Sequence, residues 1–188
     1  MGMKSKFFPA LTTGELYEIL KARAEIFVVE QNCVYQDLDG RDYQSLHAFF
    51  EEDGMVTAYL RAYARDENTM QMGLVLTLKH GTGLGGKLLK AGIAQVREKY
   101  HPDRIYIEAQ RYAVGYYERE GFRVCSEAFL EDGIPHVGIE LITEKAIISY
   151  LTWFRQKTHR LASGVSEGNG FSNSIGTPST LGCFSAAN

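Results

Sequence analysis

Several features that often decide a protein's location or class are scarce in this 188-residue sequence. It contains no run of about 18 consecutive apolar residues, the length that a helix needs to cross a bilayer. Its first residues, Met1 to Lys6, do not lead into the apolar core of a secretory signal peptide. The net charge is only −3. We therefore expect a cytoplasmic protein without a membrane or nucleic-acid partner.

Cysteine is also scarce, and its placement excludes two further classes of protein. Cys33, Cys125 and Cys183 are odd in number and lie far apart, without the short spacing of zinc ligands. A disulfide framework and a metal site are therefore not expected. We interpret all three residues as free thiols.

The chain length suits one domain of roughly 150 residues plus an appendage. With 45% hydrophobic and 23% charged residues, the composition is that of an ordinary globular protein. We place the domain at residues 1–143, an amphipathic helix at 144–161 and a Ser/Gly-rich tail at 162–188. The apolar stripe of that helix favours docking on its own domain or on a dimer mate over a membrane-surface or separate partner helix.

The hydrophobic pattern predicts an α/β domain. Thr12 to Glu15 has the form of a capping box before a helix at 13–30. The Asp53-Gly54 pair predicts a hairpin, so that three strands form an antiparallel meander. The later elements alternate between helix and strand. The expected strands are 46–51, 55–63, 70–78, 104–108, 121–130 and 136–142, and the expected later helices are 83–100 and 113–120.

The segment His80 to Lys87 carries the strongest functional signal. Its alternating glycines can adopt positive φ and carry no Cβ, so that successive N–H groups can converge on an anion at the start of the following helix. The helix dipole adds to this attraction. Moreover, residues 68–97 contain no Asp or Glu but several Lys and Arg. The segment therefore predicts a phosphate-binding loop.

Two nucleotide-binding motifs compete for this loop. Gly81-x-Gly83-x-x-Gly86 matches the dinucleotide fingerprint, and Glu108 lies where an acid could bind a ribose hydroxyl. However, that motif normally follows the first strand of a parallel sheet, whereas here it follows an antiparallel meander. A P-loop is excluded because Leu88 stands where Ser or Thr would bind magnesium. A nucleotide-dependent oxidoreductase remains an alternative.

A motif after the glycine loop favours another interpretation of that loop. The glycine loop is followed by Gln110-Arg111-Tyr112-Ala113-Val114-Gly115-Tyr116-Tyr117-Glu118-Arg119-Glu120-Gly121-Phe122. With these two motifs the chain resembles the GNAT superfamily of N-acetyltransferases, and within it the ElaA-type branch. Supporting segments are 26–40 and 131–139, and the resemblance covers roughly residues 5–143. His80 and Gln110 depart from the family pattern, which has Gln or Arg and Asn at these positions.

The resemblance implies a GNAT-type domain, a mixed and mainly antiparallel sheet flanked by helices, that uses acetyl-CoA and no metal. A primary amine, on a small molecule or a peptide, would attack the thioester directly. Tyr117 matches the family's acid facing the CoA sulfur, and Gln110 stands in the same motif. A CoA-binding regulatory module without catalysis is the other alternative. The implied cofactor-binding residues are Val75, Leu76, Thr77, His80, Gly81, Thr82, Gly83, Leu84, Gly85, Gly86 and Gln110.

The sequence alone does not identify the general base. Glu30, Glu108 and His136 are polar residues on or beside elements expected near the cleft, and a base acting through water is equally possible. Acidic residues outnumber the lone Arg41 between positions 30 and 53. If the Glu30–Asp42 part borders the acceptor site, it would suit a cationic amine; a solvated loop is the alternative.

Overall fold

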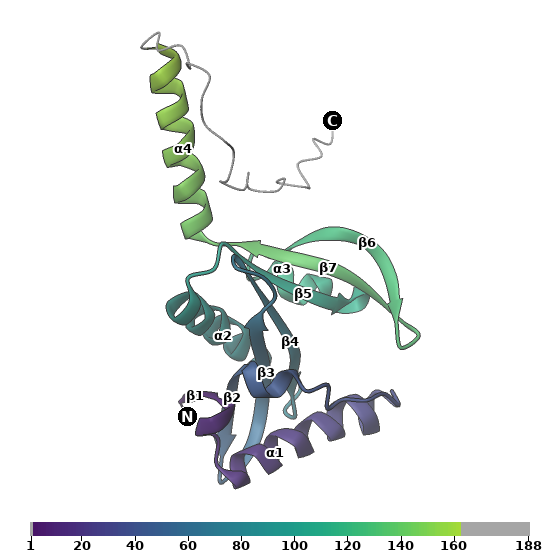
Figure 1. The fold of residues 1–188 in the computed structure, drawn as a ribbon. Coiled ribbons are helices and arrows are strands. Elements are labelled where there is room, and N and C mark those ends of the chain that lie inside the picture. The colour runs from purple at the N-terminus through teal and green to yellow at the C-terminus, as the bar shows by residue number, and fades with distance from the viewer. Residues whose placement is uncertain (1, 163–188) are drawn as a thin grey trace.

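The computed structural model describes residues 2–162; the tail from residue 163 and Cys183 lie outside them. A seven-stranded sheet has the order β1-β2-β3-β4-β5-β7-β6, and only the β4–β5 pair is parallel (Figure 1). The predicted single α/β domain with a mixed, mainly antiparallel sheet is confirmed. The strands are β1 Met3–Phe7, β2 Leu46–Glu52, β3 Met55–Ala64, β4 Thr69–Thr77, β5 Arg104–Gln110, β6 Arg123–Glu131 and β7 Ile134–Ile142.

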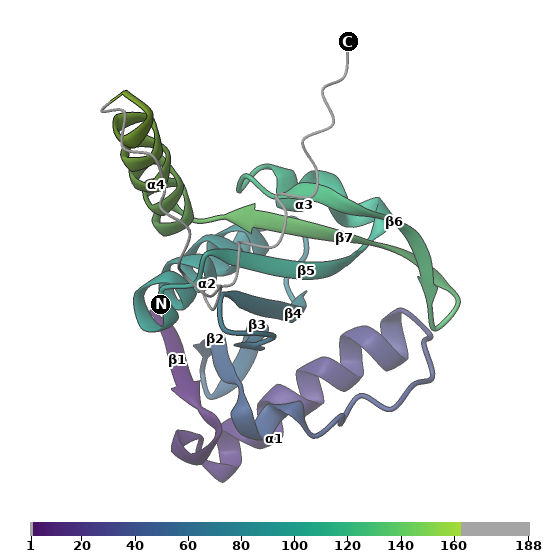
Figure 2. The same ribbon diagram turned by 45° about the horizontal axis from the view of Figure 1, so that its top comes forward.

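Helices cover both faces of the sheet. The helix α1 lies on one face and α2 and α3 lie on the other (Figure 2). The predicted helix at 13–30 has the expected extent, but its last part, Ala24–Glu30, is a π-helix. The helices are α1 Thr13–Arg23, α2 Leu84–Tyr100, α3 Val114–Glu118 and α4 Glu144–Ala162.

The start of α1 shows how the first strand, which the sequence analysis missed, is held. Thr12 and Glu15 form the predicted capping box. Lys4 and Lys6 of β1 both donate hydrogen bonds to Glu15. Burial would raise the pKa of Glu15, but these lysines and the Thr12 N–H lower it to about 2. The polar segment 3–7 is therefore a strand because its lysines pair with a buried carboxylate.

The core is divided between the two faces of the sheet. One apolar cluster packs between the sheet and α2 and includes Leu60, Ile107 and Ile139. A smaller cluster packs between the sheet and α1 and includes Ile19 and Tyr59. Because side chains alternate along a strand, this division fixes which face each polar residue of β3, β5 and β7 occupies.

The strands β4 and β5 separate in the middle of the sheet. They pair only between Thr69–Gln71 and Arg104–Tyr106. Farther along β4, a bulge places Leu74 and Val75 opposite Leu60, and Leu74 has a φ of 50°. The β5-facing edge of β4 is therefore free of strand pairing beyond Gln71, which opens a gap between the two halves of the sheet.

The helix α4 projects away from the domain (Figure 1). Its large apolar side chains stay half exposed, including Ile147 at 50% and Trp153 at 53%. The expected docking of this helix on its own domain is therefore not seen in the described residues. Docking on a dimer mate stays a prediction.

Candidate active site

The glycine loop borders a cavity of about 280 Å³ at the start of α2. Thr77, at the end of β4, forms one side, and Tyr116 and Arg119 form the other. His80, Gly81, Gly83, Gly85 and Gly86 also line it, whereas Thr82 and Leu84 do not. Leu84 lies in the core, and the Thr82 hydroxyl donates to the Lys79 carbonyl, which stabilises the turn.

The glycines of this loop serve two different purposes. Gly81 and Gly83 have φ values of 72° and 75°, a conformation that other residues adopt at a cost. Gly86 is helical, and a Cβ added there would meet no atom within 4 Å. The space above Gly86 is therefore open to a ligand, beside first-turn N–H groups that have no acceptor within the helix.

Charges around the loop are more balanced than the sequence suggested. Residues 68–97 contain no acidic side chain, but carboxylates from other parts of the chain contact their basic residues. Lys79 forms an ion pair with Glu52. Nε2 of His80 lies 3.1 Å from Oε2 of Glu30. The expected basic field is therefore partly neutralised by residues that are distant in the sequence.

A second, larger cavity of about 420 Å³ passes through the gap between β4 and β5. It is lined from the α2 side of the sheet by Ile107 and Tyr117, and from the α1 side by Glu108 and Gln110. Val75 lines this cavity and Thr77 lines the first one, so that the end of β4 runs from one cavity to the other. Leu76 between them is buried in the α1-side core.

Two adjacent tyrosines of α3 have different surroundings. The Tyr116 hydroxyl donates a 2.7 Å hydrogen bond to the Gly85 carbonyl, which attaches α3 to the glycine loop. Tyr117 packs edge-on against Tyr116 and Phe122 and lines the larger cavity. Burial raises the pKa of Tyr117 well above that of a free phenol. Tyr117 is therefore a neutral hydrogen-bond donor at the wall of the cavity.

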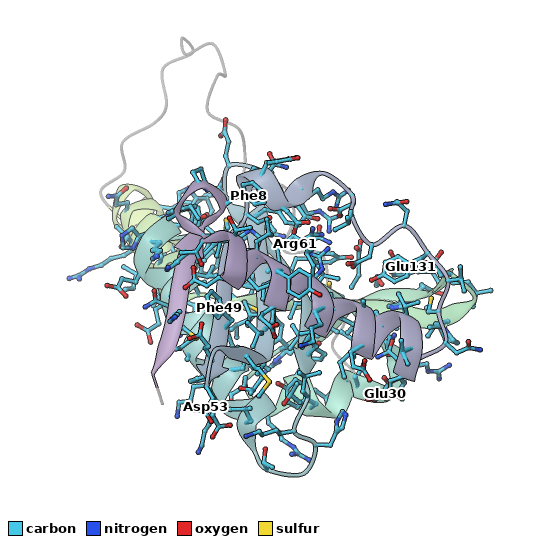
Figure 3. The ribbon with its side chains drawn as sticks, turned by 90° about the horizontal axis from the view of Figure 1, so that it is seen from below. Phe8, Glu30, Phe49, Asp53, Arg61 and Glu131 are labelled. Carbon is cyan, nitrogen blue, oxygen red and sulfur yellow. The ribbon has the colours of Figure 1, made fainter. Side chains whose placement is uncertain are left out.

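A loop after α1 forms the opposite wall, and a buried ionic network that the sequence analysis missed holds it. Arg23 is fully buried and donates to Asp37 and Asp42. Arg61 on β3 binds Asp39 and Asp42. Figure 3 looks onto this face and labels Arg61. Helical spacing placed Arg23 on α1 without revealing its partners, because they lie 14 and 19 residues away.

This network changes the interpretation of the acidic segment. Asp37, Asp39 and Asp42 are paired with arginines, so they do not form an uncompensated negative surface for a cationic acceptor. Gln31 accepts a hydrogen bond from Gln110 across the cavity. The structure therefore gives this segment mainly a supporting role, as one wall of the cavity.

The described residues contain no group of three or more His, Cys, Asp or Glu side chains placed to hold a metal ion. Within the same residues, no helix is long and apolar enough to cross a membrane. Cys33 lies at the wall of the larger cavity and is a free thiol.

Comparison with known proteins agrees with this arrangement. Residues 17–143 match a family described as "Acetyltransferase (GNAT) domain". The chain belongs to the GNAT family of acetyltransferases. The match spans the sheet from β2 to β7 and both cavities, and it ends immediately before α4.

Relatives within the GNAT family support the predicted ElaA-type branch. A UPF0039 protein of Mycobacterium tuberculosis is 42% identical over 135 residues, which cover 68% of this chain and 84% of that protein. ElaA of Escherichia coli is 31% identical over 135 residues, covering 69% and 88%. An acyl-CoA N-acyltransferase from Pseudomonas aeruginosa is similar in structure, with a TM-score of 0.70, 35% identity and coverage of 74% and 99%.

The observed fold also argues against the dinucleotide motif. A dinucleotide-binding domain has its loop after the first strand of a parallel sheet. Here the loop follows β4, and β4–β5 is the only parallel pair among residues 2–162. The dinucleotide interpretation of Gly81, Gly83 and Gly86 therefore lacks its structural context.

Proposed function

We propose that this protein transfers the acetyl group of acetyl-CoA to a primary amine by direct attack in a ternary complex. The observation that carries the proposal is the larger cavity in the gap between β4 and β5, with Tyr117 on its wall and the glycine-loop cavity at the end of β4. Family membership and the acetyl-CoA or CoA bound by homologues support the same cosubstrate.

The residues at the site fit a CoA thioester. The N–H groups at the start of α2 and the open space above Gly86 would hold the pyrophosphate. The free edge of β4 from Val75 to Thr77 would hydrogen-bond the amide groups of the pantetheine, as a strand edge does. The backbone N–H groups of Leu74 and Val75, at the bulge, would be candidates to stabilise the carbonyl oxygen as it becomes negative.

Tyr117 has the chemistry required on the leaving-group side. As the amine attacks, the carbon–sulfur bond breaks and its electron pair moves to sulfur. The buried Tyr117 hydroxyl remains protonated at neutral pH because its pKa is raised. It would donate a hydrogen bond to the developing thiolate, an interaction that is stronger in the transition state than in the ground state.

The acceptor and the assembly are parts of the proposal that rest on the sequence. The acceptor is a small molecule or a peptide with a primary amine, and catalysis takes place in the cytoplasm. The exposed apolar side chains of α4 support a homodimer, because apolar surface of this kind is usually covered in solution.

Replacing Tyr117 with Phe tests the proposal. We expect kcat to fall roughly ten- to a thousandfold, the lower range for a positioned acid or electrostatic donor. The acetyl-CoA affinity measured by calorimetry should stay within about threefold, because the lost hydroxyl acts on charge that forms during the reaction.

Tyr17→Phe on the exposed side of α1 is the matched control and should keep full activity, since Tyr17 is 67% exposed. Full activity of Tyr117→Phe would show that Tyr117 contributes only to packing. Tight acetyl-CoA binding without turnover of any amine would favour the regulatory module over the enzyme.

A further inference from the structure

We propose that His136 is the general base that takes the proton from the acceptor amine. This inference rests on the proposed acetyl transfer and assigns the residue that the sequence left open. Three candidates were available, namely Glu30, Glu108 and His136, and the structure separates them.

The position of His136 is the first argument. Val137, Ile139 and Leu141 of β7 pack toward α2, so His136 lies on the opposite face of the sheet. It is the cross-strand partner of Gln110 and lines the larger cavity. Tyr117 packs in the α2-side core. A thioester in the gap would therefore have Tyr117 on one side and His136 on the other.

The tautomer of His136 is the second argument. Its Nδ1 lies 2.9 Å from the Ile134 carbonyl oxygen. A carbonyl can only accept, so Nδ1 carries the hydrogen and donates it. In the neutral ring, Nε2 then holds the lone pair that a base needs.

The surroundings of the ring are the third argument. The His136 side chain is only 10% exposed, and it stacks on Phe129 of β6. Nε2 lies 3.8 Å from Oε2 of Glu131, which is at the β6–β7 turn labelled in Figure 3. A carboxylate in this place can hold the orientation of the ring. Glu131 is therefore a positioning residue for the base.

The other two candidates fit the role less well. Glu30 is 51% exposed, contacts His80 and does not line the larger cavity. Glu108 does line it, but its Oε2 accepts a 2.9 Å hydrogen bond from Gln71, and its Oε1 lies 3.9 Å from Arg65. Both carboxylate oxygens of Glu108 therefore already have partners, whereas Nε2 of His136 has no hydrogen bond among the described residues.

The proton balance of the reaction is complete with these groups. An acceptor arriving as an ammonium ion gives one proton to Nε2 of His136, and the neutral amine forms the new carbon–nitrogen bond as the carbon–sulfur bond breaks. Of the two remaining protons on the nitrogen, one stays in the amide and one ends on the CoA sulfur. The proton on His136 leaves to solvent, which restores the base.

Other titratable groups lining the cavity must be considered in any pH profile. They are Glu108 from β5, Glu131 and Asp132 from the β6–β7 turn, Cys33, Tyr35, Asp37, Asp39 and Arg41 from the segment after α1, Arg61 and Tyr63 from β3, and Tyr112 and Tyr117 from the segment after β5. Tyr35 donates to Asp37, and Arg23 also binds Asp37. The His136 and Glu131 variants are therefore compared directly, because only they change the proposed pair.

The experiment measures amine-dependent release of the CoA thiol from acetyl-CoA between pH 5 and 9, using benzylamine, ethanolamine, glycinamide and lysine as acceptors. For His136→Gln we expect kcat/KM for the amine to fall about 100-fold, within the usual range for a general base. The acid limb of the pH profile, which reports protonation of the ring, should disappear. Calorimetric affinity for acetyl-CoA should stay within about threefold, which also shows that the variant is folded.

Glu131→Gln should lower kcat for the amine about tenfold with acetyl-CoA affinity within about threefold, and Glu131→Asp should recover most of the loss because it restores a carboxylate beside Nε2. The matched control Glu127→Gln removes an exposed carboxylate from the same strand and should leave kcat unchanged. A purely structural role of Glu131 would lower acetyl-CoA affinity together with kcat and give no recovery in Glu131→Asp, and this result would contradict its assignment.

Three results would overturn the inference. If His136→Gln keeps activity within threefold of the parent, with the same acid limb, His136 is not the general base. This result leaves the acetyltransferase proposal intact. If nitrogen NMR shows the hydrogen of neutral His136 on Nε2 rather than Nδ1, the inferred tautomer is wrong and Nε2 cannot be the base. Absence of amine-dependent CoA release by the parent protein with all four amines contradicts the proposed function, and the role of His136 with it.

Discussion

Single side chains of this protein act through partners that are distant in the sequence. Arg23 is the clearest case, because its guanidinium is fully buried and binds Asp37 and Asp42 of the loop that forms one wall of the larger cavity. A buried charge is stable only when it is paired, and removal of one partner leaves the others uncompensated. The same residue therefore stabilises the fold and places the cavity wall.

We expect Arg23→Met to lower the free energy of unfolding by about 3 to 5 kcal/mol, the usual cost of removing one member of a buried ion pair. Urea denaturation followed by circular dichroism measures this loss. The control is Lys21→Met on the same helix, whose ion pair with Glu18 is 57% exposed on the lysine side and should contribute under about 1 kcal/mol. Similar small losses in the two variants would show that the network is not important for stability.

At the scale of elements, the sequence predicted most of the helices and strands but not how they are joined. The capping box of Thr12, the hairpin at Asp53 and the glycine loop are local signals, and all three elements formed where expected. The strand β1 was missed because Lys4 and Lys6 resemble a solvated terminus until Glu15 is placed beside them. Pairing partners of this kind are set by tertiary structure.

The candidate site shows the same limit. Glycines and Tyr117 could be found from local motifs, and the structure places them along the two cavities. The role inferred for His136 depends on a hydrogen bond to Ile134 and on the order of β5, β7 and β6, which no short motif encodes. The neutralisation of Lys79 by Glu52 likewise joins residues from different strands and loops.

The helix α4 leads to a prediction at this scale. A chain shortened after Thr143 should aggregate or change its oligomer size, because the half-exposed Ile147, Leu151 and Phe154 would form the proposed dimer interface. A chain shortened after Leu161 should keep its size, melting temperature and turnover, because the Ser/Gly-rich tail offers little apolar area to offset the entropy of ordering it.

Light scattering and an activity assay on both shortened chains check this prediction. If the chain ending at Thr143 is soluble, active and unchanged in mass per particle, α4 has no role in assembly. If the chain ending at Leu161 loses activity, the tail is not dispensable.

At the scale of the whole molecule, the two halves of the sheet separate between β4 and β5, and the proposed reaction would take place in this gap. The helix α2 and the glycine loop lie at one end of β4, the wall held by Arg23 and Arg61 covers the α1 face, and β7 carries His136 on that same face. The gap between β4 and β5 connects these parts, since residues from both faces line the same cavity. In the proposed reaction, this architecture would give the acyl donor and the amine separate approaches to one reacting centre.

Transfer of a labelled acetyl group tests the central claim most directly. The full-length protein is incubated with acetyl-CoA carrying carbon-13 in the acetyl group and with the four primary amines, and the products are identified by mass spectrometry. The account predicts an amide that carries the labelled acetyl group, formed in equal amount with free CoA and reduced at least tenfold by Tyr117→Phe. Release of CoA without any acetylated amine, or tight binding of acetyl-CoA with no reaction, would contradict it.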